Sequence, residues 1–272
     1  MSTAVLPTSG FPITPPVAVS SVFLPKEHGS WSLALEPIAL GLLIAPSWAG
    51  GALAGAALAG FFARRPLKAS LSPVQSPRRQ AARETLVMWS ALAVAGLFEA
   101  GVLGGWNALW PLLPAAGLGG VFIYFDTQNE ARAAAAEVAG SAAFALVPAT
   151  LALLAGQPGS VALALAVLAV ARSVPAILTV RAYLRAMKGG PIGRAPALIS
   201  SLAACGALVA LAVTGLAASC AGLLGALLLA RAVWLVGPWR PAWSARRIGM
   251  AETAVGLLYV ALFALNWPLS GT

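Results

Sequence analysis

Residues 25–46 read PKEHGSWSLALEPIALGLLIAP, in which a short polar group is followed by an apolar run that begins at Trp31. Comparable apolar runs recur to the end of the chain, each near the roughly 20 residues that a helix needs to cross a bilayer. The 272 residues are 60% hydrophobic and 9% charged, whereas a soluble domain carries about 25% charged residues. The runs also lack the apolar–polar alternation of a membrane barrel. The sequence therefore predicts an all-α membrane protein.

Nine transmembrane helices can be placed along this chain in a single bundle. The predicted spans lie at about residues 30–45, 48–63, 84–103, 108–125, 137–155, 160–180, 195–213, 216–235 and 248–267. The first two spans are short and are separated only by Pro46-Ser47, so they either cross with a tilt or form a re-entrant pair. Several tryptophans lie at span ends, where indole favours the headgroup level.

The distribution of charge supports this threading. With nine spans, every lysine and arginine of the connections falls on one side, and the four connections on the other side carry no charge. Cytoplasmic loops are enriched in Lys and Arg, so we expect a cytoplasmic N-terminus and an external C-terminus. The net charge of +9 then indicates contact with anionic membrane lipids, and no nucleic-acid module is recognisable.

The chain divides into two parts. Residues 1–24 contain Pro, Ser and Thr without a positive n-region, and we expect a disordered cytoplasmic tail rather than a cleaved signal peptide. Residues 25–272 form one polytopic transmembrane domain. Cys205 and Cys220 lie in apolar runs without a nearby His or a CxxC pair, so we predict no metal site, no disulfide and no bound cofactor. A single histidine also excludes a haem held between two histidines.

Ionisable residues inside a span cost several kcal/mol unless they find a partner or water, so they are the default functional candidates. Glu36, directly before Pro37, and Arg172, just ahead of Pro175, lie within predicted spans. Glu99 and Arg231 also lie within spans, and Glu137 opens the fifth.

A polar cavity open to the cytoplasm could collect the charged residues of that half of the bundle, and its cations could hold a phosphate or carboxylate. Glu130 and Glu137 are seven residues apart, and Arg181, Arg185 and Lys188 follow a helical stripe. The predicted cavity residues are Lys26, Glu27, His28, Glu36, Arg64, Arg65, Lys68, Glu130, Glu137, Arg172, Arg181 and Arg185. The alternative is that these residues form buried structural pairs or snorkelling ends. His28 is correspondingly either an acid–base group of this site or a polar cap at the membrane surface.

Three stretches carry a resemblance to a known family. They are PKEHGSWSLALEPIALGLLIAP at 25–46, FFARRPLK at 61–68 and ARSVPAILTVRAYLRAMKGG at 171–190. Together they resemble the YwiC-like family of bacterial membrane proteins. That resemblance implies a multi-pass protein of the bacterial inner membrane and no established reaction.

A more distant likeness is to the UbiA superfamily of intramembrane prenyltransferases. The nine predicted helices, Lys26, Pro37, Gly41 and the Arg65-Pro66-Leu67 run are similar to features of that superfamily. Its enzymes bind magnesium diphosphate through two aspartate-rich motifs, because hard cations require clustered carboxylate oxygens. Here the two corresponding connections contain no aspartate, and Glu84 is the only acid at their edge.

Three hypotheses about function follow. The first is a membrane protein without an assignable reaction that binds a lipid-like or anionic ligand, such as an isoprenoid or a small anion, in the cytoplasmic-side polar cavity. The second is a divergent UbiA-like prenyl or isoprenoid transferase whose basic loops replace magnesium. The third is a small transporter, suggested by proline and charge within the spans.

Overall fold

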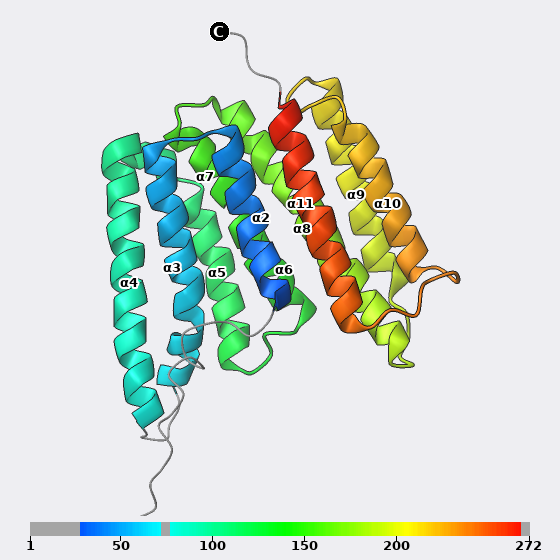
Figure 1. Cartoon of the computed structure of the whole chain (residues 1–272), viewed down its shortest axis with the longest axis horizontal. Helices are drawn as coiled ribbons and strands as arrows, with labels where there is room; N and C mark the ends of the chain where they lie inside the picture. Colours follow the sequence, from blue (N-terminus) through cyan, green and yellow to red (C-terminus); the bar gives the residue numbers. More distant parts are fainter. Residues whose placement is uncertain (1–27, 72–76, 268–272) are drawn as a thin grey trace, which may run out of the picture.

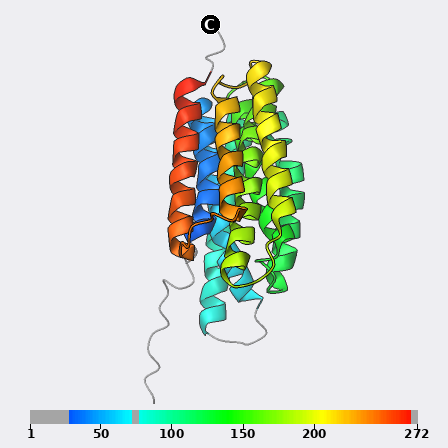
Figure 2. The ribbon, with the colours of Figure 1, turned by 90° about the vertical axis from the view of Figure 1, so that its right-hand side faces the viewer.

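A computed structural model describes residues 28–71 and 77–267 of the chain, and these residues form helices and no strands. The helices pack side by side in one bundle, with their axes roughly along a common direction (Figure 1 and Figure 2). Their bounds are α2 (His28–Ile44), α3 (Trp48–Ser70), α4 (Pro77–Gly104), η1 (Trp106–Leu109), α5 (Leu112–Thr127), α6 (Ala134–Ala145), α7 (Val147–Leu154), α8 (Gly159–Met187), α9 (Arg194–Val213), α10 (Ala221–Val236) and α11 (Ala245–Asn266).

Each predicted span corresponds to one helical pass, but not all passes have the length and apolarity of a membrane span. Within the described ranges, six passes meet both conditions: α4, η1 with α5, α6 with α7, α8, α9 and α11. The apolar parts of α2 and α10 are shorter. The last two turns of α3 carry Arg64, Arg65 and Lys68. The number of described helices long and apolar enough to span a membrane is therefore six, lower than the predicted nine spans, although the all-α membrane fold is confirmed.

The helix boundaries differ from the predicted ones for local reasons. Pro148 cannot donate to the Phe144 carbonyl, and the fifth span is divided at Leu146 into α6 and α7. The eighth span begins five residues late, at Ala221, because the turn after α9 extends to Cys220 and closes with bonds from Leu216 and Ala217 to the Leu211 carbonyl.

Short turns join the passes at the uncharged end of the bundle. Ser47 caps α3 by accepting a hydrogen bond of 2.9 Å from the Gly50 amide, which satisfies one of the free donors of the first turn. Gly156 follows α7 with φ of 75°, a left-handed conformation that glycine adopts without a steric penalty. Helices α2 and α3 consequently run antiparallel (Figure 1).

Helix α8 forms the centre of the bundle. Leu165 and Leu168 are fully buried in a cluster that also contains Leu208 of α9 and Phe263 of α11. A second cluster joins α2, α3 and α7 through Ile38, Leu53, Leu151 and neighbouring side chains. A Cβ atom on Gly41 would lie 2.6 Å from Leu151 Cδ1, so this glycine lets α2 and α7 approach closely.

The cationic connections all lie at one end of the bundle, which we call the basic end. Helices α3, α5, α8 and α10 end there, and α4, α6, α9 and α11 begin there, at the bottom of Figure 1. Arg64 near the end of α3 and Arg185 in the last turn of α8 are therefore on the same side. This arrangement is the one that the segregation of charge predicts.

Candidate functional site

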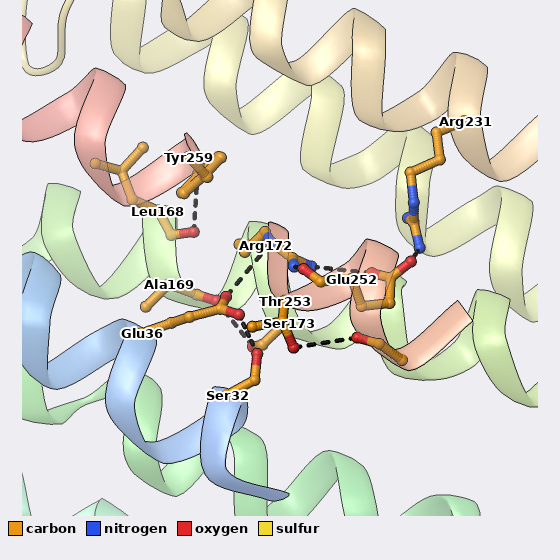
Figure 3. Close-up of polar contacts among 11 residues, drawn as sticks. Ser32, Glu36, Leu168, Ala169, Arg172, Ser173, Arg231, Glu252, Thr253 and Tyr259 are labelled. Atoms are coloured by element: carbon orange, nitrogen blue, oxygen red, sulfur yellow. Dashed lines mark hydrogen bonds and ion pairs between the residues drawn. The ribbon is translucent and has the colours of Figure 1, made fainter. Parts of the chain in front are cut away.

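Four charged residues meet inside the bundle, one from each of four helices (Figure 3). They are Glu36 of α2, Arg172 of α8, Arg231 of α10 and Glu252 of α11. We call these four residues the core charge network. Two negative and two positive side chains make its formal charge zero, which lowers the cost of placing charge away from water.

Arg172 is the centre of the core charge network. Its Nη2 donates to the Glu252 carbonyl oxygen at 2.7 Å, and its Nη1 donates to the Glu252 carboxylate at 3.5 Å. Its Nε lies 3.5 Å from Glu36 Oε2 but has no hydrogen-bond partner among the described residues. Arg231 forms an ion pair with the same Glu252 carboxylate. Glu252 thus interacts with both arginines, whereas Glu36 interacts with one.

Groups from α2, α8 and α11 surround the Glu36 carboxyl group, and the one from α8 is Arg172. Ser32, one turn earlier on α2, donates a hydrogen bond to Glu36 Oε1. On α11 the carboxyl group lies against Gly256, and a Cβ at that position would overlap it. Pro37 lacks an amide hydrogen, so the helical bond to the Leu33 carbonyl is absent next to the carboxylate.

A buried tyrosine of α11 forms a hydrogen bond to α8 beside the core charge network. The Tyr259 hydroxyl donates to the Leu168 carbonyl at 3.0 Å, one turn from Arg172. Ser173 donates to the Ala169 carbonyl at 2.8 Å on the same part of α8. Each of these carbonyl bonds satisfies a buried hydroxyl group.

A second charged group lies at the basic end and joins α3 to α5. Arg64 Nε and Lys68 Nζ each lie 3.0 Å from one carboxylate oxygen of Asp126. The side chain of Asp126 is only 8% exposed while that of Lys68 is 43% exposed. The Arg64 guanidinium also lies 4.5 Å from the centre of the Phe122 ring, a cation–π distance. Two cations share one carboxylate here, which leaves a local charge of +1.

A third charged group follows on the other side of the α5–α6 connection. Arg181 of α8 pairs with Glu137 of α6 at 2.6 Å and also donates to the Arg132 carbonyl. Arg185, one turn further along α8, is exposed and forms no ion pair with any described residue. Glu130 is exposed in the connection itself.

A row of aromatic rings lies one turn from Arg64 and Arg65, between α2, α3, α4 and α6. Trp31 contacts Phe61 and Phe62 at 5.9 and 5.4 Å between ring centres. Phe61 contacts Phe144 at 6.0 Å, and Phe62 contacts Trp89 at 5.0 Å. We call these five residues the aromatic row.

The predicted cavity residues thus divide into separate groups. Glu36 and Arg172 are brought together in the core, Arg64 and Lys68 at Asp126, and Glu137 and Arg181 on the far side of the same connection. Lys26 and Glu27 lie outside the described residues, and His28 is described only as the first residue of α2. Within the described ranges no three His, Cys, Asp or Glu side chains are close enough to hold a metal ion.

Sequence reasoning missed Glu252 and Asp126, the two acids on which most of these cations converge. Glu252 lies inside the ninth predicted span and Asp126 directly follows the fourth. A search for acids to balance Arg172 and Arg231 within the membrane would have found Glu252.

Comparison with known proteins finds a match to one family model over the N-terminal part of the chain. Residues 24–147 match the family model described as YwiC-like protein. This segment is YwiC-like. It covers α2 to α6 and ends at the first residue of α7, so it contains Glu36 and Asp126 but not Arg172, Arg231 or Glu252. The predicted YwiC-like resemblance is confirmed, and its third stretch, at 171–190, lies beyond the matched segment.

No curated protein and no solved structure matches the chain. The UbiA likeness therefore stays a prediction.

Proposed function

We propose that this YwiC-like protein is a multi-pass protein of the bacterial inner membrane that binds an anionic amphiphile at its basic end. In this proposal the basic end and the N-terminus are cytoplasmic and the C-terminus is external. The amphiphile's acidic head group contacts cations near the end of α3, and its apolar part lies along the helices in the bilayer.

The excess of cations at the basic end is the observation that carries this proposal. Fourteen described Lys and Arg side chains lie there, against four acids. The cations are Arg64, Arg65, Lys68, Arg78, Arg79, Arg83, Arg132, Arg181, Arg185, Lys188, Arg194, Arg240, Arg246 and Arg247, and the acids are Glu84, Asp126, Glu130 and Glu137. The core charge network is neutral and does not offset this surplus of described cations, which is therefore available to anions from outside the chain.

Arg64 and Lys68 are the best-placed cations for a head group. Both nitrogens lie 3.0 Å from the Asp126 carboxylate, so two cations lie side by side with a net local charge of +1. Neither side chain uses all its donors on that one carboxylate, since arginine has five and lysine three. The aromatic row lies one helical turn further into the bundle, where the apolar part of an amphiphile would begin.

Lipid binding to the purified full-length protein in nanodiscs tests this proposal. Native mass spectrometry should show retention of phosphatidylglycerol over phosphatidylcholine. The double variant R64Q/K68Q should lower that retention by about tenfold, because a hydrogen bond to a charged group contributes about 1.5–3 kcal/mol. The matched control R246Q/R247Q removes two exposed charges at the same end and should change it little.

The variant D126N separates binding from structural damage. It removes the carboxylate that competes with the ligand for Arg64 and Lys68, so retention of phosphatidylglycerol should stay equal or rise. Equal losses in both double variants, or weaker retention in D126N, would contradict a defined head-group site on α3.

A further inference from the structure

The two carboxylates of the core charge network are unequally compensated. The Glu252 carboxylate pairs with two arginines, Arg172 and Arg231, and Arg172 also donates to the Glu252 backbone carbonyl. Glu36 has the Ser32 hydroxyl and an arginine Nε at 3.5 Å that makes no hydrogen bond to it. Of the two acids, Glu36 is therefore the one whose negative charge is less firmly held.

The groups that face Glu36 can satisfy its neutral form as well as its charged form. A serine hydroxyl is both donor and acceptor, so Ser32 donates to the carboxylate and can accept from the protonated acid. Gly256 of α11 presents no side chain to the carboxyl group. The remaining titratable groups nearby are Arg172 on α8, Glu252 and Tyr259 on α11, and Arg231 on α10 beyond Glu252.

A proton fits this place better than a metal ion. Hard cations require several oxygen ligands, and the part of the chain that the structure describes offers no such cluster of acids. The guanidinium of Arg172 next to Glu36 Oε2 would also repel a metal cation. A proton needs one carboxylate oxygen and one acceptor, which Glu36 and Ser32 supply.

We propose that Glu36 is a proton-binding site inside the bundle. A proton from water forms an O–H bond with a Glu36 carboxylate oxygen, and the charge of the core charge network rises from zero to +1. Arg172 then keeps its two bonds to Glu252, and the ion pair that joins α2 to α8 is lost. Protonation of Glu36 therefore weakens the attachment of α2 to α8 without breaking the Arg172–Glu252 contact.

Infrared difference spectroscopy of the full-length protein in nanodiscs tests this site. Lowering the pH should produce a carboxylic-acid carbonyl band that shifts when the protein is labelled with ¹³C-carboxyl glutamate, which separates glutamates from Asp126. Exposed glutamates such as Glu130 contribute the same background in every variant, so the band is compared with that of the wild type, and its Glu36 component should be absent in E36Q. It should persist in the matched control E99Q, because Glu99 lies on α4, outside the core charge network, and is exposed.

Two further variants keep the test decisive if E36Q does not fold. In E36D the band should remain but lose its sensitivity to the glutamate label. In S32A it should move in frequency, because the acid loses its hydrogen-bond acceptor. A band that survives in E36Q, keeps its glutamate label in E36D, or never forms while the protein stays folded would overturn the proposal. None of these outcomes depends on phosphatidylglycerol binding at Arg64 and Lys68.

Discussion

Glu252 holds a position that no other acid in the described structure shares, because two arginines from two different helices converge on it. Arg172 contacts both its carbonyl oxygen and its carboxylate, and Arg231 contacts the carboxylate. Removing one partner of a buried ion pair leaves an uncompensated charge, which costs about 3–5 kcal/mol. The loss of unfolding free energy on removing the carboxylate charge should therefore differ between Glu36 and Glu252.

We expect E252Q to destabilise the protein by about 3–5 kcal/mol and E36Q by clearly less, since E252Q removes the carboxylate charge that pairs with two arginines, whereas Glu36 pairs with one. Equilibrium unfolding in mixed micelles measures both free energies. The double variant R231Q/E252Q should recover part of the E252Q loss. A larger loss in E36Q than in E252Q would reverse the assignment of the central acid.

Gly256 allows α11 to lie against the Glu36 carboxyl group. A Cβ there overlaps the carboxylate, so G256A forces a displacement that we expect to cost about 1–3 kcal/mol. On the same helix a Cβ at Gly249 meets no atom within 4 Å. G249A should instead be neutral or stabilise by up to about 1 kcal/mol through helix propensity. Thermal unfolding of G256A and G249A measures the two changes in stability. Equal changes would contradict the close approach of α2 and α11.

At the scale of helices, small residues determine how closely neighbours approach. A Cβ at Gly96 of α4 would lie 2.8 Å from the Ala52 carbonyl oxygen of α3, whose backbone cannot easily move aside. Helix α4 packs mainly against α3 (Figure 1), so this contact bears on the attachment of the whole helix.

We predict that G96A loosens α4 and lowers the free energy of unfolding by about 1–3 kcal/mol. The control G51A lies on the neighbouring helix α3, where a Cβ meets nothing within 4 Å, and should be tolerated. Hydrogen exchange of the α4 amides should rise in G96A only. Unchanged protection of α4 in G96A would show that the α3–α4 contact is less close than the structure has it.

The helices were largely predictable from the sequence, because an apolar run of this length between charged or proline-rich connections satisfies its backbone hydrogen bonds in a membrane as a helix. The division at Leu146 and the late start of α10 were not, since both depend on how a turn satisfies its own carbonyls. Glu36 and Arg172 were recognisable as costly residues in a membrane. Their connection through Glu252 was not, because Arg172 and Glu252 are 80 residues apart and only the packing of α8 on α11 brings them together.

For the whole molecule, the described cations outside the core charge network lie at one end, and none lies at the other. Moving such an end across a bilayer would carry fourteen cations through hydrocarbon, at about 2.5–3.5 kcal/mol for each that reached the centre. The orientation is therefore fixed when the protein inserts into the membrane. Labelling at the two ends of one long helix measures that orientation.

Helix α8 supplies these two positions, Ser160 in its first turn and Lys188 directly after its last, both exposed. Its 29 residues extend over about 43 Å at 1.5 Å per residue, enough to cross the hydrocarbon core. In a background without Cys205 and Cys220, an impermeant maleimide should label S160C in intact cells and K188C only after permeabilisation. The opposite pattern would place the basic end outside, where the cations would no longer face the anionic leaflet. The amphiphile proposed for Arg64 and Lys68 would then have to come from the external leaflet.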